Sequence, residues 1–429
     1  MKIVLKNVNL LNPEQNLNKT TDLLIEDGKI ARIGDLEKKD LEGAKIFEYE
    51  QAVVVPGLFD MHVHLREPGR EDEETVHTGS NAAAAGGFTE IACMPNTNPA
   101  IDSAEIVSSI KAKSYKHLVE VYPVAAITHG REGEGLSPIA ELVEAGAIGL
   151  SDDGKSVKNS AVLMGAFDYA KMFNVPIIEH CEDPSLADGV MNESLVSTML
   201  GLPSKPSIAE DIIVMRDISL AEYTGGKLHI AHVSTKKSCE IIRDAKARGV
   251  NVTAEVTPHH FTLTDEAVKS FDTNLKMNPP LRTKEDLDAV IEAIKDGTID
   301  CIASDHAPHS IEEKDVEFIY APDGIVGLET SLGLALSELV HKKHITFEQL
   351  VNLMAVNPRK ILGIPVPKIA EGEMANLSVI EPDTVWTVDV KKFKSKSKNS
   401  PFDKKLLNGK SVAVINKGKM YTSEGFIEI

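Results

Sequence analysis

Apolar and polar positions follow one pattern at the two ends of the chain and another in its middle. Residues 1 to about 52 alternate in short runs such as KIVLKNVNLLN and DLLIEDGKIARIGD, separated by polar turns. Period-two alternation between turns is typical of antiparallel strands. Residues 366–429 contain similar runs, including MANLSVIEP, WTVDV and KSVAVINKGKMYTSEGF. We therefore expect residues 1–52 and 366–429 to build one small β-sandwich domain together.

The middle of the chain, residues 53–365, alternates between β-rich runs and segments with helical spacing. The eight β-rich runs read VVVPGLFD, FTEIACMP, VEVYPVAAIT, GAIGLS, VPIIEH, KLHIAHV, GVNVTAEVT and TIDCIASD. Segments such as EETVHTGSNAAAAGG and KKSCEIIRDAKARG lie between them and end in glycine, a common helix terminator. Eight strand–helix units over about 300 residues predict an α/β fold, a (β/α)8 TIM-like barrel, whose first strand starts at Val53. The alternative is a doubly wound open sheet, although no G-x-G-x-x-G follows the first run.

Composition and charge narrow the class of protein. The 429 residues are 42% hydrophobic and 26% charged, an ordinary balance for a chain with a large core. The formal net charge of −19 leaves no basic excess for phosphates, so we expect neither nucleic acid nor a membrane surface as a partner. The four cysteines form no C-x-x-C, and the N-terminus does not read as a signal peptide. These features favour a cytoplasmic protein without disulfides.

Side chains that can bind metals stand at the predicted carboxyl ends of several barrel strands. In chain order they are His62, His64, Asp152, Asp153, His180, His232 and Asp305. Reactive groups gather at this face of a (β/α)8 barrel. Since side chains two apart on a strand share a face, His62 and His64 can bind one ion while Val63 points away. Four histidines and two aspartates suit two ions, preferably zinc, that share a bridging carboxylate.

Eight short motifs, in order, resemble those of dihydroorotases of the amidohydrolase superfamily, in particular the long bacterial type. They read HVHLREPG, MPNT, SDDG, EHCED, AHVST, TPHH, KMNPPLR and SDHAPH. The resemblance covers nearly the whole chain. It implies reversible, zinc-dependent cyclisation of N-carbamoyl-L-aspartate to L-dihydroorotate with loss of water, the third step of pyrimidine synthesis.

The resemblance also implies the metal ligands and the proton carrier. The implied ligands, for two zinc ions, are His62, His64, Asp153, His180, His232 and Asp305. Asp305 would also serve as general acid and base. Many relatives use a carboxylated lysine as the bridging ligand, and Lys155 is the alternative to Asp153 here. Asp152 is expected to support the loop.

The substrate contacts implied by the resemblance are His64, Arg66, Asn96, Asn278, His309, Asp323 and Gly324. Arg66 and Asn96 match residues that hold the α-carboxylate, and a guanidinium fork fits a carboxylate well. The backbone of Asp323 and Gly324 would contact the pyrimidine ring. Relatives often read APFG where this chain reads APDG, so an acid replaces an apolar neighbour of the ring.

Two other functions fit the same motifs less completely. A hydantoinase or allantoinase would be expected to carry a bridging lysine, and it gives no reason for Arg66 together with Asn96. A non-catalytic assembly subunit on the same barrel would typically have lost ligands, and all six are present here. Some dihydroorotases assemble with aspartate transcarbamoylase, the preceding enzyme; the sequence leaves this partner and a homodimer open.

Overall fold

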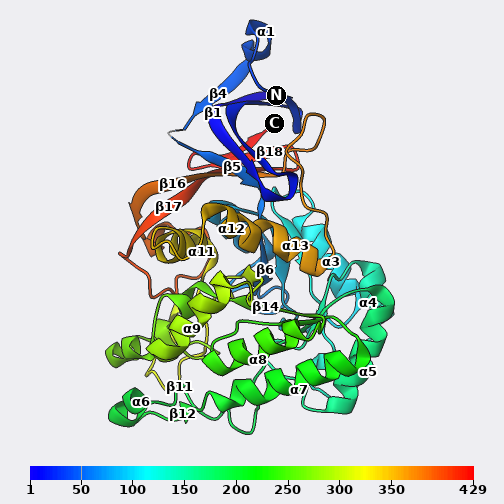
Figure 1. The fold of residues 1–429 in the computed structure, drawn as a ribbon, viewed down its shortest axis with the longest axis vertical. Coiled ribbons are helices and arrows are strands. Elements are labelled where there is room, and N and C mark those ends of the chain that lie inside the picture. The colour runs from blue at the N-terminus through cyan, green and yellow to red at the C-terminus, as the bar shows by residue number, and fades with distance from the viewer. Residues whose placement is uncertain (50) are drawn as a thin grey trace.

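The computed structural model describes residues 1–49 and 51–429. A barrel surrounded by helices carries a smaller layer of strands at one end, where both chain termini lie (Figure 1). Within the described residues, no helix is both long and apolar enough to cross a membrane.

Parallel strands close into a ring at the centre of the barrel. The described strands form a three-stranded sheet, β6-β7-β8, and a five-stranded sheet, β15-β14-β13-β10-β9. The parallel bridges Ala125–Leu150 and Val63–His306 join the two sheets on both sides. The predicted (β/α)8 barrel is thereby confirmed. Its strands are Leu58–Val63 (β6), Phe88–Cys93 (β7), Glu120–Pro123 (β8), Leu150–Ser151 (β9), Ile177–Glu179 (β10), Leu228–Ile230 (β13), Val252–Val256 (β14) and Cys301–Ile302 (β15).

Helices surround this ring, and some of them lie between it and the terminal strands (Figure 1). The outer helices are Val76–Gly86 (α2), Ala104–Ser114 (α3), Ile139–Ala145 (α4), Ser160–Phe173 (α5), Leu195–Leu200 (α6), Ile208–Thr224 (α7), Lys236–Ala247 (α8), Lys284–Lys295 (α9) and Ile311–Lys314 (α10). The intervening ones are Leu328–Ala335 (α11), Phe347–Val351 (α12) and Asn357–Leu362 (α13). A short parallel pair, Met191–Asn192 (β11) and Ser204–Lys205 (β12), flanks α6.

Strands from both chain ends share one sheet. In the described part of the chain it has nine strands, in the order β19-β18-β17-β16-β5-β1-β2-β3, with β4 paired to β1. The strands are Lys2–Asn12 (β1), Leu17–Glu26 (β2), Lys29–Ile33 (β3), Ala44–Glu48 (β4), Val53–Pro56 (β5), Leu377–Thr387 (β16), Leu406–Asn416 (β17), Lys419–Thr422 (β18) and Gly425–Glu428 (β19); helix Lys38–Leu41 (α1) precedes β4. Both ends thus meet as expected, while the sandwich form stays a prediction.

The run VVVPGLFD serves two sheets, which the sequence pattern did not predict. Val53–Pro56 pairs with β1 and β16 in the terminal sheet, and the first barrel strand begins at Leu58. Gly57 marks the break, because a Cβ there would lie only 2.0 Å from Oγ1 of Thr89. Both pieces are buried throughout, so apolar periodicity gives no sign of the change of sheet.

A buried arginine joins the barrel to the terminal sheet. Arg359 donates from Nε to Oε2 of Glu90 (2.8 Å) and from Nη1 to the carbonyl oxygen of Gly57 (2.7 Å). The other oxygen of Glu90 accepts from Nδ2 of Asn376 (2.8 Å), just before β16. This end of the barrel is therefore closed by structure, and the carboxyl ends of the strands are left for chemistry.

Candidate active site

The six predicted ligands converge at the carboxyl ends of the barrel strands. His62 Nε2 lies 3.5 Å from Oδ1 of Asp153, and His64 Nε2 lies 3.6 Å from Oδ2 of the same carboxylate. His180 Nδ1 and His232 Nε2 also lie near Asp153 Oδ1, at 3.6 and 3.5 Å. Asp153 thus faces two pairs of imidazoles, the geometry expected of a bridging ligand.

Asp305 completes the cluster beside the first histidine pair. Its Oδ1 lies 3.0 Å from His64 Nε2 and 3.6 Å from His62 Nε2. Asp305 has φ of 47°, and His232 has φ of 32°, so two of the six ligands adopt the left-handed region. Strained backbone of this kind costs free energy and is concentrated at functional sites.

The other two residues considered for the fourth strand do not face the cluster. The side chain of Lys155 is exposed. Asp152 is buried and accepts a hydrogen bond from the backbone N–H of Thr128 (3.1 Å). Asp152 therefore stabilises the loop at Thr128. The structure places Asp153, not Lys155, between the histidine pairs.

The donor set fits zinc. With zinc–nitrogen bonds of about 2.0–2.1 Å, neighbouring ligand atoms of a tetrahedral ion lie about 3.3–3.4 Å apart. The separations above run from 3.0 to 3.6 Å, and His180 Nδ1 lies 3.0 Å from His232 Nε2. Among the described residues, His62 Nε2 and Asp153 Oδ1 are buried without a hydrogen-bond partner. Buried polar atoms are rarely left so unless an ion or water satisfies them.

Neighbouring polar groups fix which nitrogen each histidine presents. Nδ1 of His62 lies 2.6 Å from Oε1 of Glu255, a carboxylate that can only accept, so the neutral ring has its lone pair on Nε2, available to an ion beside Asp153. Nδ1 of His64 lies 2.7 Å from Oδ1 of Asn96 in the same way. Such partners orient metal-binding imidazoles and raise their basicity.

The charges in the cluster favour the binding of cations. Burial disfavours a charged imidazole at His180, but Asp153 and Glu182 outweigh burial and raise its pKa to about 10. Burial alone would raise the pKa of Asp305, yet His64 and His62 hold it below its usual range. Three carboxylates (Asp153, Asp305 and Glu255) thus stay ionised among imidazoles, and the same field would attract divalent ions.

Arg66, the predicted clamp for the substrate carboxylate, lies beside the cluster. An acid that the motifs did not reveal holds it there. Arg66 Nε lies 3.1 Å from Oε2 of Glu73 and donates to the carbonyl oxygen of Pro308 (3.0 Å). Oε1 of Glu73 lies 3.1 Å from Nδ1 of His309. Nη2 of Arg66 lies 3.3 Å from Nε2 of His309. One buried carboxylate therefore holds two of the predicted substrate-binding side chains together.

The remaining predicted contacts also border this region. Asn278 Nδ2 lies 3.2 Å from His180 Nε2. The backbone carbonyl of Asp323 lies 2.8 Å from His309 Nε2, while its carboxylate-bearing side chain is exposed. Gly324 has φ of 131°, and a Cβ there would lie 2.6 Å from Cβ of Ala307. The acid in APDG therefore faces solvent, and only glycine fits beside it.

The sequence motifs missed two acids that hold the site, although one left a signal. Glu255 is a lone charged residue within the apolar run GVNVTAEVT, and the structure buries it completely against His62, His229 and the backbone of His232. An acid inside a buried strand needs a partner, which could have identified it. Glu73 lies in a polar loop segment and carried no such signal.

Comparisons with known proteins agree with this geometry. The family model described as Dihydro-orotase-like matches residues 51–238. The chain is 50% identical over 428 residues to the dihydroorotase of Pelotomaculum thermopropionicum, with 100% of both chains covered. It is 51% identical over 427 residues to that of Acetivibrio thermocellus, covering 98% of this chain and 99% of the relative.

Solved structures show the same architecture at lower identity. An L-hydantoinase (dihydropyrimidinase) from Arthrobacter aurescens matches with a TM-score of 0.86 at 25% identity, covering 100% of this chain and 97% of the other. The dihydropyrimidinase of Brevibacillus agri matches with a TM-score of 0.84 at 22% identity, covering 100% and 96%. The barrel is thus shared with other cyclic-amide hydrolases, whereas half of all residues are shared with the two dihydroorotases along the entire chain. The chain belongs to the dihydroorotase family.

Proposed function

We propose that this protein is a zinc-dependent dihydroorotase, which interconverts N-carbamoyl-L-aspartate and L-dihydroorotate. The observation that carries the proposal is the placement of Asp153 between two histidine pairs, with Arg66 beside them. The first feature supports a two-ion hydrolase, and the second supports a substrate with a carboxylate.

The proposed chemistry divides between the ions and the protein. Two zinc ions held by the six clustered ligands would supply Lewis acidity and lower the pKa of a bound water. In the hydrolytic direction, Asp305 accepts the proton of the attacking water and delivers it to the leaving ring nitrogen. In the synthetic direction Asp305 must start protonated, so cyclisation is favoured at lower pH.

We assign substrate orientation to the side chains that lie beside the cluster. Arg66 is half-buried, and Glu73 holds its Nε, so the guanidinium is positioned before the substrate arrives. A positioned guanidinium binds a carboxylate in two parallel hydrogen bonds. The backbone around Gly324 can approach the ring closely because no Cβ intervenes. This arrangement favours an acidic cyclic amide over a neutral one.

Parallel hydrolysis assays of L-dihydroorotate, hydantoin and allantoin test the proposal. The protein should hydrolyse L-dihydroorotate with much the highest kcat/KM, because the neutral rings offer Arg66 no carboxylate. Preferential turnover of hydantoin or allantoin would replace the proposal with the corresponding hydrolase. Absence of turnover on all three, in protein loaded with zinc, would favour an assembly subunit.

We further propose that the protein acts in the cytoplasm and that its terminal sheet is a β-sandwich domain. The four cysteines are buried and unpaired, which supports a reducing compartment. Association with aspartate transcarbamoylase stays a prediction from the family, and co-purification of the two proteins tests it.

A further inference from the structure

Residues 395–399, between β16 and β17, combine small polar side chains with almost complete burial. The segment reads SKSKN, and Ser395, Ser397 and Asn399 are 2%, 6% and 5% exposed. Lys396, between the two serines, is exposed. A buried polar side chain costs free energy unless it is hydrogen-bonded, so the partners of these three side chains show what the segment holds. We call residues 395–399 the C-terminal strap.

Asn399 joins two segments that carry predicted substrate contacts. Its Oδ1 accepts a hydrogen bond from the backbone N–H of His309 (3.1 Å). Its Nδ2 donates to the carbonyl oxygens of Ala307 (3.0 Å) and Gly324 (3.1 Å). Its own carbonyl oxygen accepts from the N–H of Val326 (2.9 Å). Both polar atoms of the side chain are thus used to hold His309 and Gly324 next to each other.

Ser397 holds the residue that positions Arg66. Its Oγ donates to the carbonyl oxygen of Glu73 (2.7 Å). The carboxylate of Glu73 lies 3.1 Å from Nε of Arg66 and 3.1 Å from Nδ1 of His309. The strap is therefore bonded to the backbone of the residue whose side chain orients two predicted substrate-binding groups.

The beginning of the strap binds a second buried acid, Glu74. The hydroxyl of Ser395 donates to Oε2 of Glu74, and the backbone N–H of Lys396 donates to Oε1 (3.1 Å). Oε2 of Glu74 also lies 3.2 Å from Nε2 of His306, the residue that follows Asp305. Glu74 and His306 are both buried, so this contact ties the strap to the segment that begins at Asp305.

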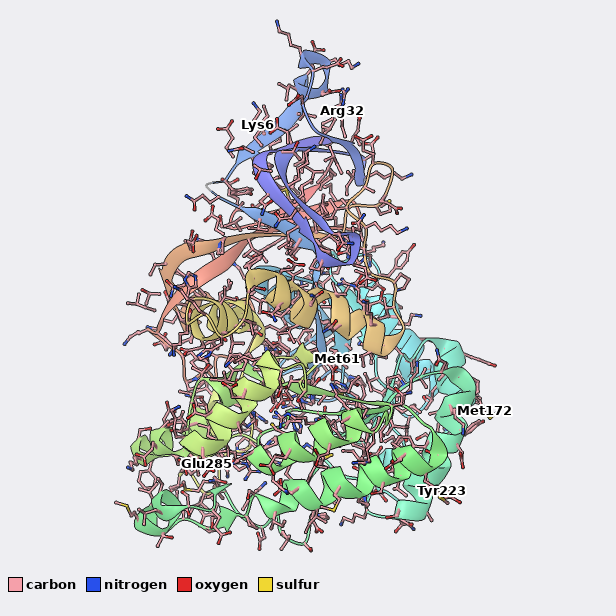
Figure 2. All side chains as sticks on the ribbon, in the orientation of Figure 1. Lys6, Arg32, Met61, Met172, Tyr223 and Glu285 are labelled. Carbon is pink, nitrogen blue, oxygen red and sulfur yellow. The ribbon has the colours of Figure 1, made fainter. Side chains whose placement is uncertain are left out.

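The strap comes from the terminal part of the chain and not from the barrel strands. Its start is held on α11, where Oε1 of Glu329 accepts from the backbone N–H groups of Lys394 (2.7 Å) and Ser395 (3.0 Å). The metal-binding cluster, in contrast, begins on β6, whose Met61 Figure 2 labels in the middle of the molecule. The strap therefore reaches the site from outside the barrel.

We propose that Asn399 is a positioning residue for the substrate, and that the strap assembles the substrate-binding side of the site. This inference rests on the proposed function. The segments at residues 73–74, 306–309 and 324 are all hydrogen-bonded to the strap or, for His306, to its partner Glu74. A site whose segments are ordered beforehand binds its ligand more tightly, because less entropy is lost on association. Asn399 makes no hydrogen bond to the six clustered ligands in the described part of the chain, so its effect should fall on substrate binding.

Steady-state hydrolysis of L-dihydroorotate by Asn399→Ala, loaded with zinc, tests the proposal. The variant loses the three hydrogen bonds that hold His309, Ala307 and Gly324 together, so KM should rise by about 10- to 100-fold while kcat changes little. An unchanged KM in folded Asn399→Ala would overturn the proposal, and so would a loss confined to kcat.

Asn416→Ala is the matched control. Asn416 is also buried, and its Nδ2 also donates to two carbonyl oxygens, those of Thr89 (3.3 Å) and Leu118 (3.1 Å), at the closed end of the barrel. This change should lower the free energy of unfolding and leave KM and kcat unchanged. An equal rise in KM in both variants would show that Asn399 acts only through general stability.

Ser397→Ala supplies a milder variant in case Asn399→Ala does not fold. It removes one neutral hydrogen bond between the strap and the backbone of Glu73, so KM should rise by about 5-fold. A KM equal to that of the wild type would contradict the role of the strap.

Backbone hydrogen exchange tests the positioning without any reaction. Asn399→Ala removes the acceptor of the His309 N–H, so exchange in residues 306–310 should be faster than in the wild type, whereas exchange in β7 should be unchanged. Equal exchange at His309 in both proteins would overturn the proposal. Failure of the proposed function would appear separately, as a wild type that does not hydrolyse L-dihydroorotate.

Discussion

Asp153 shows how a single residue can define the chemistry of this molecule. Its two oxygens lie within 3.6 Å of four imidazoles at the ends of three strands, β6, β10 and β13. Their position along the chain predicted these histidines as candidate ligands, because each stands where a strand ends. The acids that hold them were not predictable in the same way. Glu255 and Glu73 act through contacts between distant segments, and no local pattern encodes such pairings.

Asp305→Asn tests the assignment of the proton carrier. The amide cannot accept the proton of the attacking water, so kcat should fall by about 10²- to 10⁴-fold. Steady-state hydrolysis of L-dihydroorotate measures the change, with zinc content and circular dichroism as checks on the site and the fold. The exposed Asp315→Asn serves as the control. If Asp305→Asn kept near-normal kcat, another group would have to carry the proton.

Glu73→Gln tests whether one carboxylate positions Arg66 and His309. Hydrogen bonds to charged groups are worth about 1.5–3 kcal/mol, so their loss should raise KM for L-dihydroorotate by about 10- to 100-fold. The value of kcat should change little, because Glu73 lies beside the clamp and not among the six clustered ligands. The exposed Glu71→Gln, two residues away, should leave both constants unchanged. A loss confined to kcat would show that Glu73 does not act through substrate binding.

At the scale of elements, the sequence pattern predicts well which strands exist. It predicts less well where each strand begins and which side of an element is buried. Each of the eight β-rich runs overlaps an observed barrel strand, since buried parallel strands leave continuous apolar runs. The same continuity hid the change of sheet at Gly57. The inward side of helix α7 mixes apolar side chains such as Ile213 with Glu210 and Asp211, which accept hydrogen bonds from the segment after His232, and periodicity alone does not predict these buried acids.

Glu329 on α11 predicts a pH dependence of stability. Burial raises the pKa of its carboxyl from 4.5 to about 8, although the N–H groups of Ser395 and Lys394 donate to it. The folded state therefore holds the proton more tightly than the unfolded chain. The resulting stabilisation is fully present below pH 4.5 and is lost as pH rises to about 8.

Denaturant unfolding of the wild type and Glu329→Gln at pH 5 and pH 8 measures this effect. The wild type should lose about 3 kcal/mol more than the variant over this interval, since glutamine does not ionise. An equal pH dependence of the two proteins would show that Glu329 does not titrate with folding.

At the scale of the whole molecule, the two ends of the chain stabilise the closed end of the barrel. Arg359, which is fully buried, reaches Glu90 on β7 and the carbonyl oxygen of Gly57, and Glu90 in turn binds Asn376. The terminal sheet is thus joined to the barrel through buried charges, at the end opposite the metal-binding cluster. The C-terminal segment also reaches the site end of the barrel, where Asn399 accepts from the backbone N–H of His309 and donates to the carbonyl oxygen of Gly324.

Arg359→Met should destabilise the fold without altering the chemistry. It leaves the Glu90 carboxylate buried without its cation, a change that typically costs about 3–5 kcal/mol. Lys360→Met removes the lysine that follows Arg359 in the chain, which is half-exposed and pairs with Glu14. This change should lower the free energy of unfolding by at most about 1 kcal/mol. Chemical denaturation measures both. Equal stability of the two variants would mean that the buried pair adds nothing to the junction.

The dependence of L-dihydroorotate hydrolysis on metal tests the central claim most directly. Loss of absorbance at the ultraviolet band of the substrate is followed with the purified protein, after chelation, and after stoichiometric zinc is restored. We expect turnover that chelation abolishes and zinc returns, with recovery complete at two zinc ions per chain. Full hydrolysis of L-dihydroorotate by metal-free protein would contradict the account.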